Sequence, residues 1–138
     1  MRMITGRCLC GGVTYQASGE PITTRTCWCR LCQAIGAGSA TVNTCFRTED
    51  VAIVGELADY QSIADSGARM HRRFCPRCGV HLFSQAESRP HLIFVRVGSM
   101  DDREAVRPEL TIWTREAPRW ACIAEDVPRL EAQAPPAG

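Results

Sequence analysis

The spacing of the cysteines restricts the fold of this chain more than any other feature. Seven of the nine cysteines fall into three short groups, and neighbours within a group are separated by one or two residues. The groups are Cys8 with Cys10, then Cys27, Cys29 and Cys32, then Cys75 with Cys78. Thiolates are the ligands that zinc, copper(I) and iron–sulfur clusters prefer. The pattern therefore indicates that soft metal ions are part of the folded protein.

The composition is that of a globular domain. The chain has 138 residues, of which 45% are hydrophobic and 22% charged, so it can bury a sizeable core and is not disordered. No apolar run approaches the roughly 20 residues of a membrane span. The formal net charge is +1 and the arginines are scattered, which argues against a nucleic-acid partner. We predict one domain over residues 1–130 and a frayed tail over residues 131–138.

The cysteine count also bears on the compartment. The first seven residues contain no apolar stretch of the kind found in a signal peptide, so we expect a cytoplasmic location. Thiols stay reduced there, and closely spaced cysteines then bind metals or act in catalysis more often than they form disulfides. The odd number of cysteines agrees with this interpretation.

Short segments of alternating or β-branched residues, separated by turn residues, predict a mainly β fold. The expected strands are residues 13–18, 51–54, 57–62, 70–74, 80–84, 91–97 and 109–113. Helical signals are fragmentary. Two of these strands flank Cys75-Pro76-Arg77-Cys78-Gly79, which predicts a zinc-ribbon-like hairpin with the cysteines at its turn.

The first and third groups together form a plausible set of four ligands. A C-x-x-C turn followed by glycine folds its backbone around an ion, and on an extended strand Cys8 and Cys10 would point to one side. A closed tetrahedral set of four cysteines is a structural zinc site. The ion would join Cys8 and Cys10 to Cys75 and Cys78, far along the chain, and metal binding would then contribute to folding.

The middle group, Cys27, Cys29 and Cys32, offers only three ligands. Three protein ligands and an open fourth position are typical of catalytic zinc, which polarises a carbonyl or activates a bound thiol or water. Three thiolates donate much charge, which suits an exogenous thiolate, and Arg25 and Arg30 can offset that charge. We therefore expect two zinc ions per chain, of which the three-ligand ion is the more easily lost.

Two other arrangements of the ligands are open. A fourth protein ligand would close the middle site, and the candidates are Cys45, His71, His81 and His91. Alternatively, Cys29-x-x-Cys32 would pair with Cys75-x-x-Cys78 as an ordinary zinc ribbon. We prefer the division into four and three because it uses all seven clustered cysteines.

With these motifs in view, the chain resembles the glutathione-dependent formaldehyde-activating family, also called the centromere protein V-like family. The resemblance spans roughly residues 2–130. It rests on Gly6-x-Cys8-x-Cys10-Gly11-x-Val13-x-Tyr15, Cys27-x-Cys29-x-x-Cys32, Phe74-Cys75-x-x-Cys78-Gly79, Gly98-x-Met100-Asp101-Asp102 and Trp113…Ala117-Pro118-x-Trp120. At Trp28 and Gln33 the chain differs from the family, which often has His and Arg there.

The resemblance implies an Mss4-like fold of small antiparallel β-sheets stapled by structural zinc. It also implies the division already described, with structural zinc on Cys8, Cys10, Cys75 and Cys78 and catalytic zinc on Cys27, Cys29 and Cys32. The family's founding activity is the formation of S-hydroxymethylglutathione from glutathione and formaldehyde, which is a carbon–sulfur lyase activity. The substrates implied are a small glutathione-like thiol and an aldehyde or its S-adduct.

The leading hypothesis is therefore a cytoplasmic zinc enzyme that joins a small thiol to an aldehyde or splits the adduct. One alternative is a non-catalytic, zinc-stapled binding module or thiol carrier. Another is a redox or metal-buffering protein whose middle cluster loses zinc on oxidation.

Overall fold

The computed structural model describes residues 2–138 and is mainly β, as the sequence predicts. Its strands are β1 (Ile4–Arg7), β2 (Thr14–Ala17), β3 (Thr23–Cys27), β4 (Thr41–Arg47), β5 (Val51–Val54), β6 (Ala58–Ile63), β7 (Arg69–Phe74), β8 (His81–Ala86), β9 (Leu92–Arg96) and β10 (Leu110–Ile112). The helical segments are α1 (Arg30–Ile35) and the single 3-10 turns η1 (Thr48–Asp50), η2 (Val97–Ser99), η3 (Arg103–Ala105) and η4 (Thr114–Glu116).

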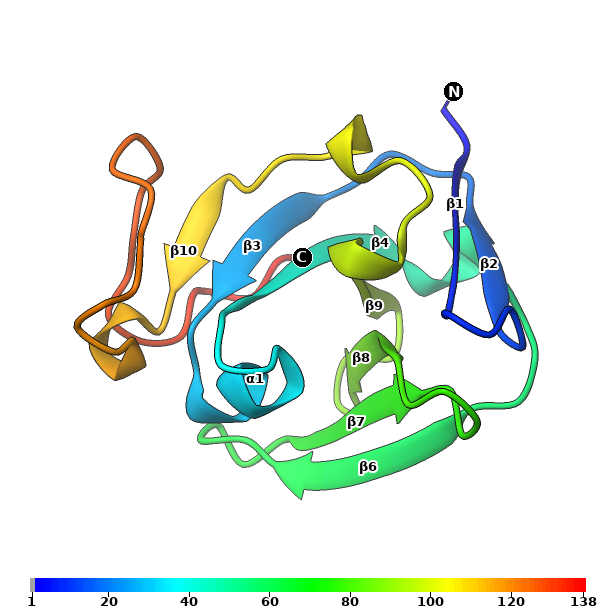
Figure 1. Ribbon diagram of the computed structural model, residues 1–138, viewed down its shortest axis with the longest axis horizontal. Coiled ribbons are helices and arrows are strands. Elements are labelled where there is room, and N and C mark those ends of the chain that lie inside the picture. The colour runs from blue at the N-terminus through cyan, green and yellow to red at the C-terminus, as the bar shows by residue number, and fades with distance from the viewer. Residues whose placement is uncertain (1) are drawn as a thin grey trace.

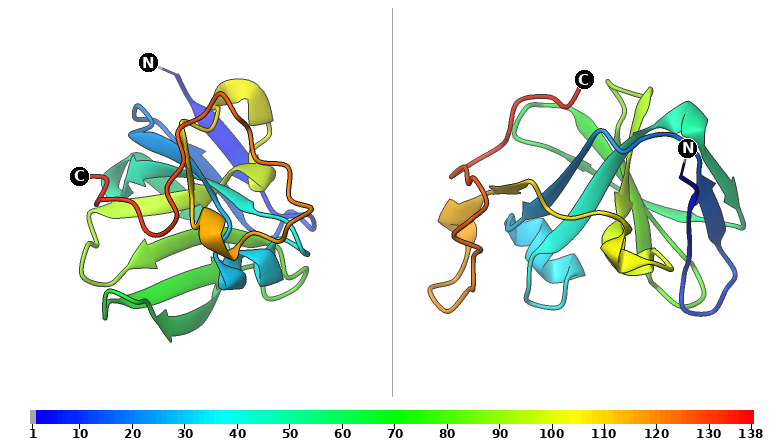
Figure 2. Two further views of the ribbon diagram at one scale, coloured as in Figure 1. Left: turned by 90° about the vertical axis from the view of Figure 1, so that its left-hand side faces the viewer. Right: turned by 90° about the horizontal axis from the view of Figure 1, so that it is seen from above.

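The strands form two sheets. The smaller has the order β1-β2-β5, and the larger has the order β10-β3-β4-β9-β8-β7-β6. Neighbouring strands are antiparallel except β10, which runs parallel to β3. Figure 1 shows the larger sheet curling around α1, which lies against its inner face. The segment after β10 and the β1–β2 hairpin lie at opposite ends of the molecule (Figure 2).

The two sheets enclose the main core. On the face of the larger sheet away from α1, Phe83 and Val95 are opposite one another and fully buried. Tyr15 of β2 packs edge-on against Phe83, with ring centroids 5.3 Å apart, and its hydroxyl hydrogen-bonds to Ser99 at 2.8 Å. Gly6 passes under the Tyr15 ring so closely that a Cβ there would overlap it. A second, smaller core surrounds Trp28, Ile112, Trp113 and Ala134.

The expected strands are present, each within a few residues of its predicted bounds, and β7 and β8 form the hairpin around the Cys75–Cys78 turn. Three strands were not predicted, β1, β3 and β4, and the last two have sequences rich in threonine. Threonines of β3 and β4 can be buried because they hydrogen-bond to each other: the Thr24 and Thr44 hydroxyls are buried and 2.8 Å apart. The consecutive strands β5 and β6 belong to different sheets.

The chain after β10 returns alongside that strand. Thr111 N–H donates to Pro128 O at 2.9 Å, and Leu130 N–H donates to Thr111 O at 2.8 Å. The division into a domain and a tail at residue 130 stays a prediction. None of the helices within residues 2–138 has the length and apolar character needed to span a bilayer.

Candidate metal centres and active site

The first cysteine cluster lies where two turns meet. Cys8 and Cys10 belong to the turn between β1 and β2, and Cys75 and Cys78 belong to the turn between β7 and β8. All four sulfurs lie within 4.8 Å of one another, and neighbouring sulfurs are 3.7 Å (Cys8–Cys10) and 3.6 Å (Cys10–Cys75) apart. A tetrahedral zinc with Zn–S bonds of roughly 2.3 Å separates its sulfurs by about 3.8 Å. The four residues therefore fit a zinc ion.

The turns also direct backbone N–H groups at these sulfurs. Val13 N donates to Cys8 Sγ (3.3 Å), Gly12 N to Cys10 Sγ (3.4 Å) and Arg77 N to Cys75 Sγ (3.4 Å). The N–H groups of Cys10 and Val80 lower the pKa of Cys78 to about 6. Donors of this kind stabilise thiolates, which are the form that binds metal.

The expectation that Cys8 and Cys10 lie on a strand was wrong. They lie in a turn in which Gly11 N–H donates to Cys8 O at 3.2 Å. Gly11 has φ +78°, and Gly79 has φ +75° at the matching place after Cys78. Glycine adopts this conformation without steric cost, so each turn can close tightly around its two sulfurs.

The second cluster is built at the start of α1. Cys27 ends β3, Cys29 is the residue that caps α1, and Cys32 lies in the helix's first turn. The three sulfurs lie within 4.8 Å of one another, and Cys29 Sγ accepts a hydrogen bond from Cys32 N at 3.3 Å. Cys27 and Cys32 are buried and Cys29 is partly exposed. The helix cap is thus also the point at which the cluster is open to solvent.

No fourth histidine, cysteine or carboxylate joins this cluster within residues 2–138. Of the four candidates, Cys45 instead points its thiol at Phe46 O (3.9 Å), and His71 is held between Asp59 (2.6 Å) and Glu87 (3.0 Å). The cysteines that the sequence pairs are brought together as a four and a three, and the ribbon arrangement is not formed. That the two clusters hold zinc stays a prediction.

The three thiols of the second cluster shift one another's pKa. The neighbouring thiols of Cys27 and Cys29 lower the pKa of Cys32, whereas those of Cys29 and Cys32 raise the pKa of Cys27. The three thiols therefore do not ionise independently. A bound divalent ion would let all three be thiolates, since metal ligands must be deprotonated.

The two arginines expected to offset this charge differ in position. Arg25 is buried two residues before Cys27, whereas Arg30 is exposed and its backbone N–H donates to Glu116 Oε2 at 2.6 Å. Sequence reasoning missed a second buried arginine, Arg96 of β9, which lies on the same face of the sheet as Cys27. Its position depends on pairings with β4, a strand that the sequence did not reveal.

Trp28 and Gln33 both have structural roles beside the second cluster. Gln33 Nε2 donates to Trp28 O at 2.7 Å and to Glu116 O at 3.0 Å, which ties α1 to β3 and to η4. The Trp28 side chain is buried in the smaller core with Trp113. Trp120, in contrast, is 70% exposed.

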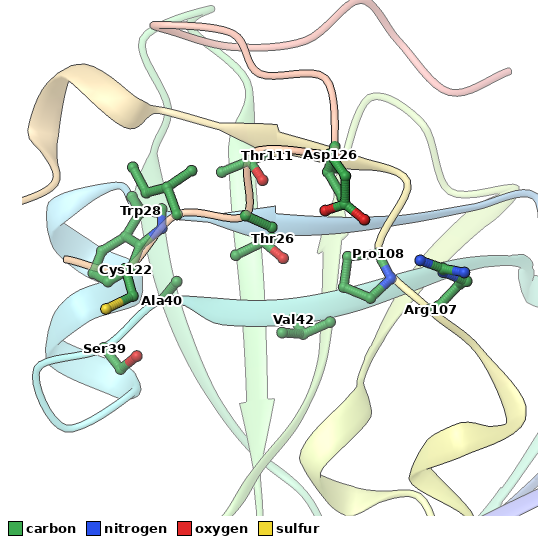
Figure 3. A pocket seen from close by; sticks show the side chains of 13 residues that line it. Thr26, Trp28, Ser39, Ala40, Val42, Arg107, Pro108, Thr111, Cys122 and Asp126 are labelled. Carbon is green, nitrogen blue, oxygen red and sulfur yellow. The ribbon is translucent and has the colours of Figure 1, made fainter.

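The Trp28 ring also lines a cavity of about 410 Å³ between β3, β4 and the segment 122–127 (Figure 3). Thr26, Val42 and Thr111 form its floor. These residues alternate with Cys27 and Thr41, whose side chains belong to the opposite face of the sheet. This cavity is therefore separated from the second cluster by the sheet itself.

A second cavity, of about 610 Å³, lies between α1 and strands β6–β8. It is mostly apolar, and its lining residues are Leu31, Ala34, Ile35, Tyr60, Phe74, Gly79 and His81. His81 stacks on Phe74 with ring centroids 4.9 Å apart, and its Nδ1 is buried with no partner within residues 2–138. The cavity shares α1 with the second cluster, which makes it the better candidate for a substrate site.

Asp101 and Asp102, which belong to one of the motifs shared with the family, shape a turn. Asp101 accepts a hydrogen bond from the Thr5 hydroxyl at 2.7 Å, and Asp102 caps η3 by accepting from Glu104 N at 3.0 Å. Both carboxylates lie on the exposed surface. Their roles follow the usual behaviour of aspartate in turns.

The chain is similar to known proteins in sequence and in fold. The family model described as glutathione-dependent formaldehyde-activating enzyme matches residues 3–116. No curated protein matches the sequence. The crystal structure of a Rhodobacter sphaeroides protein aligns with a TM-score of 0.58 at 23% identity, over 91% of this chain and 99% of the other, and so shares the fold.

Proposed function

Because the chain belongs to the glutathione-dependent formaldehyde-activating enzyme family, we propose that it is a zinc-dependent enzyme of the carbon–sulfur lyase type. Its substrates would be a small glutathione-like thiol and an aldehyde, or their S-adduct, in the cytoplasm. The observation that carries the proposal is the cluster of three converging thiols with no fourth protein ligand in the described chain. Such a set leaves a position for an exogenous ligand, which a closed structural site does not.

The proposal gives the two clusters different roles. Cys8, Cys10, Cys75 and Cys78 would hold a structural zinc ion, and Cys27, Cys29 and Cys32 would hold the catalytic one. When bound at the second cluster, zinc would lower the pKa of a thiol at the open position. The clustered cysteines would thus form both the structural zinc site and the active centre.

The residues around the second cluster would orient and shield the substrate. Cys29 lies at the partly exposed cap of α1, where a ligand can approach. Leu31 and Ile35 of the same helix line the larger cavity, opposite Phe74. An apolar lining of this kind would receive the organic part of a substrate and exclude water from it.

The reaction itself is a simple addition. The sulfur of the thiol forms a bond to the aldehyde carbon as the carbonyl π bond breaks, and the thiol proton ends on the former carbonyl oxygen to give a hemithioacetal, which for formaldehyde is the S-hydroxymethyl adduct. The reverse reaction breaks the same carbon–sulfur bond. Because the addition also proceeds without a catalyst, the protein has only to increase an existing rate.

Exchange NMR spectroscopy tests the proposal directly. Glutathione and formaldehyde exchange with their adduct at a measurable rate in buffer, and the zinc-loaded protein should accelerate that exchange. A Cys29→Ala variant should lose the acceleration, and a variant of the exposed Cys122, Cys122→Ala, should keep it. Exchange at the buffer rate with both clusters loaded would refute the enzyme and favour the binding module.

A further inference from the structure

Two buried arginines and an asparagine form a row beside the second cluster. The strand register places Arg25 of β3 opposite Asn43 of β4, and Asn43 opposite Arg96 of β9. Arg25 is 9% exposed and Arg96 is 7% exposed. Arg25 precedes Cys27 by two positions on one strand, so the row shares a face with the cluster.

A hydrogen-bond network leads from Arg96 to the cluster. Arg96 Nη1 donates to Asn43 Oδ1 at 2.6 Å and to Thr41 Oγ1 at 3.5 Å, and Asn43 Nδ2 donates to Thr41 Oγ1 at 3.0 Å. Both acceptor positions of the Thr41 hydroxyl are therefore used, and its own proton remains to be donated. Thr41 lies opposite Cys27 in the strand register, so the network reaches the edge of the second cluster.

Neither arginine has a carboxylate partner in the part of the chain that the structure describes. The Nε atoms of Arg25 and Arg96 are buried, and within residues 2–138 no acceptor reaches them. A buried charge is costly unless an opposite charge compensates it. The thiols of Cys32, Cys27 and Cys29 act on Arg96 with opposite charge, whereas Arg72 acts on it with like charge.

The charges balance only when a further anion is present. Three thiolates and one divalent ion leave a single negative charge, whereas the two arginines supply two positive charges. A neutral fourth ligand would leave one buried positive charge without a partner. An anionic fourth ligand would neutralise the three thiolates, the divalent ion and the two arginines together, and the neighbouring Arg72 adds a further positive charge that favours an anion.

We propose that Arg96, held by Asn43, and Arg25 are positioning residues that make the open position of the second cluster prefer an anionic ligand, a thiolate, over a neutral one. The inference rests on the proposed function, because it requires a metal ion on Cys27, Cys29 and Cys32. It adds that the chain's own arginines select the ionised form of the substrate thiol.

Ligand titrations of the cobalt(II)-substituted protein test this inference without an activity assay. Thiocyanate serves as the anionic probe and imidazole as the neutral probe, and both are followed by the visible bands of cobalt. Arg96→Gln should weaken thiocyanate binding about tenfold or more, because the bound anion loses the attraction of a nearby buried positive charge. Imidazole binding should change by less than about twofold, because it has no charge to lose.

Two variants serve as controls. Arg96→Lys retains the charge and should keep most of the preference for thiocyanate. Arg73→Gln removes a half-buried arginine that is hydrogen-bonded to Gln85 on the opposite face of the sheet, and it should change neither affinity. If Arg96→Gln fails to hold the second cobalt ion, Arg25→Gln provides the same measurement with the Thr41 network intact.

The outcomes separate the two proposals. Equal changes in the affinities for thiocyanate and imidazole, or no change in either, would overturn the role of the arginines and leave the proposed enzyme standing. A wild-type cobalt spectrum that neither probe alters would show that the second cluster has no open position, and the proposed function would then fail first.

Discussion

Removal of Cys10 isolates the contribution of the first cluster to stability. The Cys10 side chain is exposed, so Cys10→Ala leaves no cavity in the core. It does remove one of four ligands that join segments 65 positions apart. By the chain-entropy relation for cross-links, a bridge across that distance restricts the unfolded chain by about 4 kcal/mol.

Denaturant unfolding in a zinc buffer is the suitable assay. The buffer should hold free zinc at a level that loads four cysteines but not the three that remain in the variant. Under these conditions Cys10→Ala should lower the free energy of unfolding by about 4 kcal/mol, a large share of the about 5–15 kcal/mol typical of a domain. Cys122→Ala, which also removes an exposed thiol, should stay within about 0.5 kcal/mol of wild type.

The metal dependence provides the decisive control. A strong chelator removes the ion from the wild type as well, and the two proteins should then unfold at the same denaturant concentration. A loss below about 1 kcal/mol in the zinc buffer would refute the reasoning. So would a difference that persists in the chelator, because it would not depend on the metal.

Three further predictions concern the fold around the sites. Hydrogen bonds to Asp59 and Glu87 raise the pKa of His71 above its usual value, so the stabilisation from the His71 ion pairs is full below about pH 6.5 and is lost as the pH rises through the raised value. Thermal unfolding should show His71→Asn to be less stable than wild type at pH 5.5, and the difference in stability should close by pH 9. A difference that stays constant with pH would contradict this. Gly6→Ala should cost about 1–3 kcal/mol because its Cβ would overlap the Tyr15 ring, whereas Gly98→Ala, with open space around it, should be near neutral in the same denaturant assay. Gln33→Ala should lower the free energy of unfolding by about 1–2 kcal/mol and speed amide hydrogen exchange in α1, because the carbonyl groups of Trp28 and Glu116 lose their donor. Unchanged exchange would show that other contacts hold the helix.

Local sequence patterns predict much of the fold. The strand β9 is predictable from its run of β-branched and apolar residues, and the turn between β7 and β8 is predictable from its C-x-x-C-Gly motif. The threonine-rich strands β3 and β4 are not, because the partners of buried hydroxyls such as those of Thr24 and Thr44 come from the neighbouring strand. A pattern method interprets such residues as exposed.

The candidate site was likewise only partly predictable from the sequence. Cysteines one or two positions apart predict a cluster from the sequence alone, and the structure brings all seven together as a four and a three. The network of Thr41, Asn43 and Arg96 is not predictable in this way, because Asn43 and Arg96 are 53 positions apart and meet only through strand register. Buried polar residues of this kind depend on long-range pairing.

The division of seven cysteines into a closed four and an open three is the central claim, and metal content tests it most directly. We would measure zinc per chain by mass spectrometry for the freshly purified protein and for Cys29→Ala. Two zinc ions in the wild type and one in the variant, with the fold retained, is the predicted result. One zinc ion in both proteins, or the loss of both ions from the variant, would contradict it.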